Sequence, residues 1–363
     1  MGRYVVKLGS NIVADDGGAL REDVMRSVCA TIAGRHRAGD DFVVVSSGAI
    51  ARGMEAMGLS ERPASMADLQ AASAVGQGRL YRVWDEMLSG EGLSSAQVLL
   101  TLFDVGHRAH YLNARQTLGR LLDWRAVPVV NENDTTATEE ISFGDNDFLA
   151  AQVAILCGAD RLVLLTNQDG LHESDPRENP DAPLVALVED PAELDGYAIG
   201  QAPSGLGSGG MRSKVVAAEM ATAAGIPTVI CNGLTAGALD RALDGAPEGT
   251  RFAARDKEHS SFELWLRYAK PTSGRLGVDA GAAKALRDEG ASLLPVGIVE
   301  VDGEFGAGDA VEITDGDGVV AKGIVAYGAE DLALLAGKRS ADADAALGRP
   351  AGEAVHRDLL VLV

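Results

Sequence analysis

The sequence predicts an α/β protein with a mainly parallel central sheet, followed by a small β-rich domain. Short apolar segments alternate with longer stretches whose apolar residues recur at three- and four-residue spacing, which is the helical period. The apolar segments are near-continuous, as is typical of parallel strands that are covered by helices on both faces. After about residue 255 the pattern changes to short strands separated by Gly and Asp.

The first part of the chain contains five buried strands and five helices by these criteria. The expected strands are residues 4–6, 42–45, 127–130, 162–165 and 228–230. The expected helices are residues 21–38, 66–88, 113–124, 146–157 and 211–224. Ligands of such sheets bind at the carboxyl ends of the strands, so candidate functional residues are sought in the loops there.

The second part is expected to be a separate domain. We expect a first domain over residues 1–255, a linker over residues 256–270 and the β-rich domain over residues 271–363. A turn and a short helix are expected over residues 274–286. Strands are expected at residues 297–301, 310–314 and 319–325. A chain of 363 residues is long enough for this division.

Composition excludes several functional classes. The formal net charge of −21 at pH 7 opposes nucleic-acid binding and is typical of a well-solvated surface. Cys29, Cys157 and Cys231 form no C-x-x-C pair, and the six histidines form no set with metal-ligand spacing, so we expect free thiols and no protein metal site. With neither a signal peptide nor a membrane-length apolar run, the expected location is the cytoplasm.

Two strand-end loops are candidate ligand sites. Lys7 ends the first strand and is followed by Gly9, so its ammonium group could reach the ligand crevice; the alternative is a surface lysine before a turn. Ser46, Ser47 and Gly48 follow the second strand and could open a helix whose N–H groups bind an anion. Plain N-capping by serine is the alternative for this second loop, and both can hold together.

A third loop is rich in acceptors and donors. Residues 131–134 (Asn-Glu-Asn-Asp) and 143–147 (Phe-Gly-Asp-Asn-Asp) follow the strand at 127–130. Such a loop suits a zwitterionic ligand with an ammonium group. The alternatives are a polar surface loop and a calcium loop, but the Gly and Glu positions do not match the twelve-residue calcium pattern.

The fourth loop, residues 204–214, reads SGLGSGGMRSK. Its four glycines would destabilise a helix or strand, but they allow backbone amides to wrap phosphate oxygens. Lys214 could add a charge beside a transferring phosphoryl group. The Walker pattern is absent, and the G-x-G-x-x-G match follows a polar loop, which disfavours a dinucleotide site. A flexible linker is the alternative. Because no Ser-His-Asp triad can be assembled, electrostatic catalysis is favoured.

These loops together resemble the amino-acid kinase family and, within it, the glutamate 5-kinases. The resemblance covers nearly the whole chain, in order, and NEND and GLGSGGM are its most specific signals. The matching stretches are VVKLGSN (5–11), VSSGAIARG (45–53), AVGQGRLY (74–81), LLTLFD (99–104), LNARQTL (112–118), VPVVNENDTTATEE (127–140), FGDNDFLAAQVAILCGAD (143–160), LLTNQDGLHESDPRENP (164–180), SGLGSGGMRSKVVAAEMA (204–221), GASLLPVGIVEVDGEF (290–305) and AVHRD (354–358).

This resemblance implies a three-layer amino-acid kinase sandwich over residues 1–255 and a PUA-like domain over residues 271–363. It implies phosphorylation of the side-chain carboxylate of L-glutamate by ATP with Mg²⁺, the first step of proline biosynthesis. Lys7 and Lys214 would be catalytic, with Asp147 orienting them, and Ser47, Asp134 and Asn146 would bind glutamate. The implied nucleotide-binding residues are Lys7, Thr166, Asn167, Ser208, Gly209, Gly210, Met211, Arg212, Ser213 and Lys214.

One position departs from the family pattern. Asn167 stands where the family often has Asp, and it keeps a polar side chain there but removes a negative charge. The resemblance also implies a homo-oligomer and feedback inhibition by proline at or near the glutamate site.

Two rival functions are compatible with the sequence. One is another kinase of the same fold, acting on acetylglutamate, aspartate, carbamate or uridylate; the NEND loop and the PUA-like tail disfavour it. The other is RNA binding through the tail. Residues 270–363 carry nine Lys and Arg against sixteen Asp and Glu, a balance of −7, which disfavours RNA.

Overall fold

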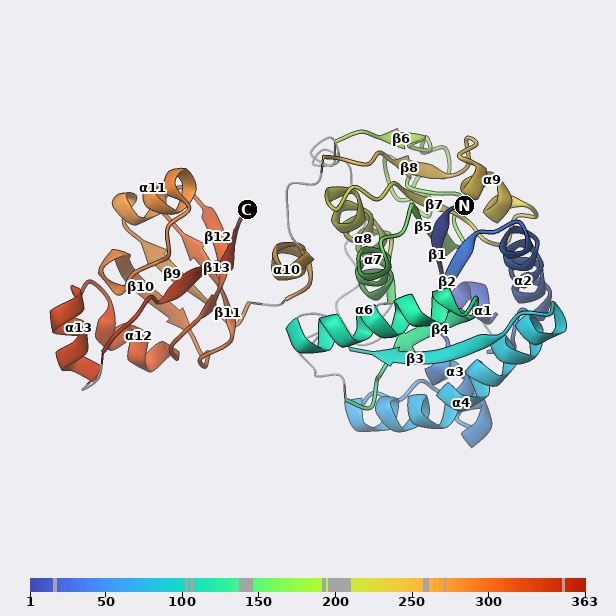
Figure 1. Cartoon of the computed structure of the whole chain (residues 1–363), viewed down its shortest axis with the longest axis horizontal. Helices are drawn as coiled ribbons and strands as arrows, with labels where there is room; N and C mark the ends of the chain where they lie inside the picture. The colour runs from blue at the N-terminus through green and yellow to red at the C-terminus, as the bar shows by residue number, and fades with distance from the viewer. Residues whose placement is uncertain are drawn as a thin grey trace. The chain divides into compact units, whose positions relative to one another are not determined.

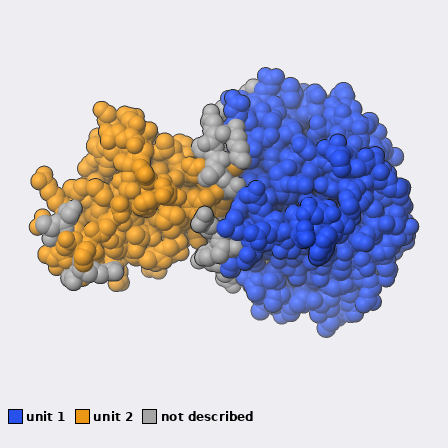
Figure 2. Space-filling model, viewed as in Figure 1, with its two compact units in different colours: residues 1–261 blue, residues 262–363 orange. Residues whose placement is uncertain are grey.

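The chain folds around two separate β-sheets. The computed structural model describes residues 1–15, 18–101, 104, 108–136, 146–190, 194, 210–256, 261–270, 272–347 and 350–363. They fall into two units, residues 1–261 and 262–363, which Figure 2 colours separately. Of the predicted site residues, Ser208 and Gly209 lie outside the described residues, as do residues 143–145.

The first unit contains an eight-stranded sheet in the order β3-β4-β2-β1-β5-β7-β8-β6 (Figure 1). Its strands are β1 (Arg3–Leu8), β2 (Asp41–Ser46), β3 (Ser95–Leu100), β4 (Val127–Glu132), β5 (Arg161–Thr166), β6 (Leu187–Val188), β7 (Thr228–Asn232) and β8 (Thr250–Phe252). Every neighbouring pair is parallel except β7 with β8. The predicted mainly parallel sheet is therefore confirmed.

Helices cover this sheet in two layers, as Figure 1 shows. One layer contains α6 (Arg108–Asp123), α7 (Asn146–Cys157) and α8 (Met211–Ala223), and α7 contacts both of its neighbours. The other layer contains α1 (Ser10–Val13), α2 (Glu22–Arg37), α3 (Ala49–Met57), α4 (Met66–Gly90) and α9 (Ala238–Asp244). This is the expected three-layer sandwich.

The central strand β1 determines where the predicted loops meet. Leu8 is paired with Ser46 at the end of β2 and with Leu165 near the end of β5. Beyond β2 lies β4, whose Val130 is paired with Val45. Because these strands are parallel, their carboxyl ends share one edge of the sheet, and the loops that follow them converge there.

Helices α3 and α4 pack unusually closely beside this edge. A Cβ atom added to Gly53 would lie 1.7 Å from the carbonyl oxygen of Ala72, and one added to Gly76 would lie 1.8 Å from that of Ala49. Only glycine permits this approach. The crossing fixes α4 against α3, whose first residues follow the Ser46-Ser47-Gly48 loop.

The second unit contains a five-stranded sheet in the order β10-β9-β11-β12-β13. Its strands are β9 (Gly274–Val278), β10 (Ile298–Gly303), β11 (Ala310–Thr314), β12 (Val319–Val325) and β13 (Val355–Leu362). Its helical segments are α10 (Ser261–Leu264), the π-helical turn η2 (Trp265–Ala269), α11 (Ala280–Glu289), the 3₁₀ turn η3 (Pro295–Gly297), α12 (Ala329–Leu335) and α13 (Ser340–Leu347). Within this unit, Trp265 and Leu266 pack against Ala310 and Val361.

The prediction of a turn at the start of residues 274–286 is wrong. Residues 274–278 form β9, which lies between β10 and β11, and only the following helix is as expected. Two glycines hide the alternation of this strand. A Cβ atom on Gly274 would lie 2.6 Å from the carbonyl oxygen of Asp302 in β10, so glycine is needed there for close approach within the sheet.

No helix among the described residues is long and apolar enough to cross a bilayer.

The α3–α4 crossing gives a test of the fold. We expect Gly76→Ala to lower the free energy of unfolding by about 3 kcal/mol or more, because the added methyl group collides with backbone rather than with a movable side chain. Gly78→Ala on the same helix is the matched control, since its Cβ would meet no atom within 4 Å. That control should be neutral or should stabilise by up to about 1 kcal/mol through helix propensity. Equal urea midpoints for the two variants would contradict the close packing.

Candidate functional site

Three buried charged side chains meet at the carboxyl edge of the first sheet. Lys7 Nζ lies 2.5 Å from Asp147 Oδ1, and Lys214 Nζ lies 3.0 Å from Asp147 Oδ2. Their relative exposures are 3% for Lys7, 4% for Lys214 and 0% for Asp147. The three residues come from β1 and from the first turns of α7 and α8, so the parallel sheet brings together positions that are far apart in the sequence.

The electrostatics of this cluster favour an ionised Asp147. Burial alone would raise the pKa of the carboxyl group, but the charges and hydrogen bonds of Lys7 and Lys214 outweigh it and hold the pKa well below its usual range. The position of Asp147 in the first turn of α7 also suits a carboxylate, since a helix N-terminus carries partial positive charge. Two lysines thus lie beside one carboxylate, an arrangement that suits an anionic ligand.

The start of α8 is tied to the same carboxylate. Ser213 Oγ lies 3.0 Å from Asp147 Oδ2 and 2.9 Å from the carbonyl oxygen of Gly210, and its single proton can be donated to either. Gly210 is the N-cap of α8. The last described part of the glycine-rich loop therefore enters the helix directly beside the cluster, where backbone N–H groups favour phosphate.

A neutral polar network lies next to the charged cluster. The amide nitrogen of Asn146, the residue before Asp147, lies 3.0 Å from Ser47 Oγ and 2.8 Å from Asn131 Oδ1, and donates to both. Its amide oxygen accepts from the backbone N–H of Glu132 at 3.3 Å. The network links the ends of β2 and β4 to the first residue of α7. The Asn146 side chain, at the start of α7, is thus oriented by hydrogen bonds to both its amide nitrogen and its amide oxygen.

Asp134 forms a second buried acidic position. Asp134 is only 6% exposed, and its Oδ2 atom accepts a hydrogen bond from Ser73 Oγ. Its Oδ1 atom is buried and has no hydrogen-bond partner among the described residues. Burial raises the pKa of Asp134 above its ordinary value, against the hydrogen bond from Ser73 and the charge of Arg62. A buried carboxylate oxygen without a donor is suited to receive one from a ligand.

The remaining predicted nucleotide residues lie near the same edge. Thr166 ends β5 and is buried, and its carbonyl oxygen accepts from Gly233 N at 2.9 Å. Asn167 is exposed just beyond it. Met211 and Arg212 are in the first turn of α8, where Arg212 is exposed.

Sequence reasoning missed Ser73 and Gln77, which both contact site residues. Ser73 donates to Asp134, and the side-chain oxygen of Gln77 accepts from Asn131. Both lie inside α4 rather than in a strand-end loop. Only the packing of α4 brings them to the site, so no local sequence signal identifies them.

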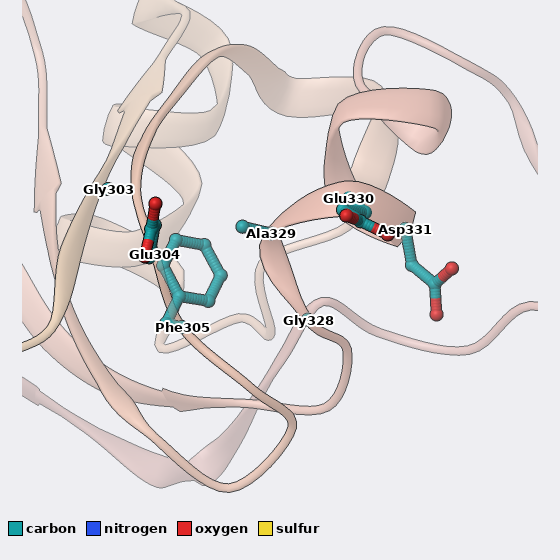
Figure 3. Close-up of a pocket in the computed structure, with 7 residues that line it drawn as sticks. All are labelled: Gly303, Glu304, Phe305, Gly328, Ala329, Glu330 and Asp331. Carbon is teal, nitrogen blue, oxygen red and sulfur yellow. The ribbon is translucent and has the colours of Figure 1, made fainter.

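The second unit offers a pocket of different character, shown in Figure 3. Its lining residues are Gly303, Glu304, Phe305, Gly328, Ala329, Glu330 and Asp331. Three of them are acidic and none is basic, which disfavours phosphate groups. Among the described residues of both units, no three His, Cys, Asp or Glu side chains are grouped as metal ligands.

Comparisons with known proteins agree with this geometry. Residues 2–232 match the amino acid kinase family, and residues 274–347 match the PUA domain. The chain is 45% identical to the glutamate 5-kinase of Meiothermus ruber, over 99% of this chain and 95% of that protein. It is 45% identical to that of Thermus thermophilus (99% and 97%) and 44% identical to that of Mycobacterium tuberculosis (99% and 94%).

Solved structures that resemble the chain include an isopentenyl phosphate kinase, with 18% identity and a TM-score of 0.49, over 69% of this chain and 100% of that one. A UMP kinase from Bacillus anthracis gives 17% identity and a TM-score of 0.49, over 71% and 97%.

The buried cluster makes a prediction about stability. Asp147→Asn should lower the free energy of unfolding by about 3–5 kcal/mol at pH 7, because it leaves two buried lysines facing a neutral amide. The folded-state pKa of Asp147 is depressed, so its stabilisation is present above the ordinary Asp pKa of about 3.9 and is lost as the pH falls through the folded-state value. The difference in the free energy of unfolding between the parent and Asp147→Asn should therefore become smaller only below about pH 4.

The control is Asp244→Asn, which removes an exposed partner of Arg35 and should cost no more than about 1 kcal/mol. Urea unfolding at several pH values measures both variants. If Asp147→Asn were as stable as Asp244→Asn at pH 7, the assigned electrostatics of the cluster would be wrong.

Proposed function

Because the chain belongs to the amino acid kinase family, we propose that it transfers the γ-phosphoryl group of ATP to the side-chain carboxylate of L-glutamate. The product would be L-glutamyl 5-phosphate, at the first step of proline biosynthesis. The observation that carries this proposal is the Lys7–Asp147–Lys214 cluster beside the polar network of Asn146. The 45% identity with glutamate 5-kinases over almost the whole chain supports the choice of substrate.

The chemistry needs no general base. A glutamate side chain has an ordinary pKa of about 4.3, so its carboxylate is already a nucleophile at neutral pH. One of its oxygens forms a bond to the γ-phosphorus, the bond from phosphorus to the β,γ-bridging oxygen breaks, and ADP leaves with that electron pair. The barrier comes largely from bringing two anions together, and fixed positive charge lowers it.

Lys7 and Lys214 would supply that positive charge. Asp147 holds both ammonium groups in place and is itself fully buried, so the lysines are positioned before the substrates arrive. The backbone at Gly210 and the first turn of α8 would bind phosphate oxygens, together with the nucleotide-loop residues Ser208 to Lys214. Thr166 and Asn167 would approach the nucleotide at the end of β5.

Family membership implies ATP as the phosphoryl donor. We write Mg²⁺ as part of the nucleotide substrate, since the ion would bridge phosphate oxygens and neutralise developing charge.

Ser47, Asp134 and Asn146 would bind glutamate. The unpartnered Oδ1 atom of Asp134 would accept from the substrate ammonium group. The hydroxyl of Ser47 and the amide of Asn146, which already hydrogen-bond each other, would orient the rest of the amino acid. The residues that would bind the amino acid are thus different from the lysines that would stabilise the transferred phosphoryl group.

The proposal also covers the other parts of the protein. Catalysis would reside in residues 1–255, and the PUA-like residues 271–363 would serve a structural or regulatory role, including subunit contact in a homo-oligomer. Proline would inhibit by binding at or near the glutamate site. Addition of proline to the kinase assay tests this directly.

The reaction itself can be tested with the parent enzyme. We expect ADP release from Mg·ATP with L-glutamate but not with aspartate, N-acetylglutamate, carbamate or UMP. Hydroxylamine should trap the acyl phosphate as a hydroxamate, because an acyl phosphate reacts with this nucleophile and a phosphate ester does not. ADP release with one of the other acceptors and none with glutamate would overturn the substrate assignment.

Lys214→Ala should reduce kcat by about 100-fold or more, since removal of one preorganised charge of this kind costs about 3 kcal/mol of barrier. The variant should remain folded by circular dichroism. Lys284→Ala is the matched control, because Lys284 is exposed on α11 in the second unit. Near-normal turnover by Lys214→Ala would exclude Lys214 from the catalytic machinery.

A further inference from the structure

Ser73 contacts Asp134 from within a helix rather than from a strand-end loop. It lies on α4, is 3% exposed, and donates its hydroxyl proton to Asp134 Oδ2. A serine hydroxyl has a single proton, so this bond commits Ser73 to Asp134. The other carboxylate oxygen, Oδ1, is left buried with no partner among the described residues. The two oxygens of Asp134 are therefore in different environments.

We propose that Ser73 is a positioning residue for substrate recognition: it holds Oδ2 of Asp134 and thereby presents Oδ1 to the ammonium group of the amino-acid substrate. This inference rests on the proposed function, in which Asp134 binds that ammonium group. A carboxylate without the Ser73 contact could rotate about its terminal torsion, which is broad and poorly restrained. The hydroxyl removes that freedom before the substrate binds, so less entropy is lost on binding.

The position of Ser73 on α4 is rigid. The residue before Ser73 is Ala72, and a Cβ atom added to Gly53 of α3 would lie 1.7 Å from its carbonyl oxygen. Three residues after Ser73, a Cβ atom added to Gly76 would lie 1.8 Å from the carbonyl oxygen of Ala49. The backbone that carries Ser73 therefore cannot shift away from Asp134 without displacement of the α3–α4 crossing. A donor on such an element can fix a carboxylate to the accuracy that ligand recognition requires.

Ser73 also bears on the charge of Asp134. Burial raises the pKa of this carboxyl group, whereas the Ser73 hydrogen bond and the charge of Arg62 lower it. Arg62 precedes α4 and is exposed, and it is the charged group of the described residues that acts on this pKa. Since only ionised Asp134 pairs well with an ammonium group, loss of the Ser73 donor should weaken binding most at low pH.

The test is steady-state kinetics of Ser73→Ala. We expect the KM for glutamate to rise by roughly fivefold to twentyfold, since one hydrogen bond to a charged group is lost. The KM for ATP and kcat should stay within about twofold, because the ammonium group is remote from the reacting carboxylate. The acid limb of the kcat/KM profile for glutamate should move to higher pH, because the lost donor stabilised the ionised form of Asp134.

Two further variants separate positioning from structure. Ser73→Thr keeps the hydroxyl and should restore most of the glutamate KM. Ser95→Ala is the matched control: Ser95 Oγ lies 2.6 Å from Asp85 Oδ1, so the variant removes the same type of Ser–Asp hydrogen bond and should leave the glutamate KM and the pH profile unchanged.

A double-variant cycle completes the experiment. In an Asp134→Ala background, Ser73→Ala should have no additional effect on the glutamate KM, because the residue through which it acts is gone. A Ser73→Ala enzyme with a lower Tm but an unmoved KM and pH profile would overturn the inference and leave the proposed function intact. A parent enzyme that is inactive on glutamate would instead overturn the proposed function, and the inference with it.

Discussion

The contact between Asp147 and the two lysines constrains much of the first unit. A buried carboxylate is tolerated only when charge and hydrogen bonds compensate for its lost hydration. Lys7 provides this compensation from β1, and Lys214 provides it from α8. The central strand and two helices of one layer must therefore all be in register before the cluster can form.

The positive charge of Lys7 and Lys214 is important because the chain as a whole is strongly negative. The whole chain has a formal net charge of −21, so its average field repels a nucleotide and a dicarboxylate alike. Attraction must then be local. Lys7 and Lys214 place positive charge in a buried position, where water and salt screen it least. The proposed function requires this acidic protein to bind two anionic substrates, and the buried lysines would supply the local positive charge for it.

Much of this arrangement could be predicted from the sequence because it depends on local patterns. The strands β1, β2, β4, β5 and β7 are continuous apolar segments, and Lys7, Ser47 and Asp134 lie at or just beyond the carboxyl ends of three of them. The strand β3 was missed because it is partly exposed and lacks such a run, and β9 because its glycines interrupt the alternation. Ser73 could not be found because its role depends on helix packing rather than on neighbours in the sequence.

The first turn of α7 explains how two different ligands can be brought together. Asn146 and Asp147 are consecutive, so their side chains leave the helix about 100° apart, since an α-helix has 3.6 residues per turn. Asn146 joins the network of Ser47 and Asn131, whereas Asp147 joins the lysines. The separation between the proposed amino-acid site and the proposed phosphoryl site is then set by one peptide unit rather than by a flexible loop. Such a fixed separation is what an in-line transfer between two anions requires, because a misplacement of about 1 Å can cost about 100-fold in rate.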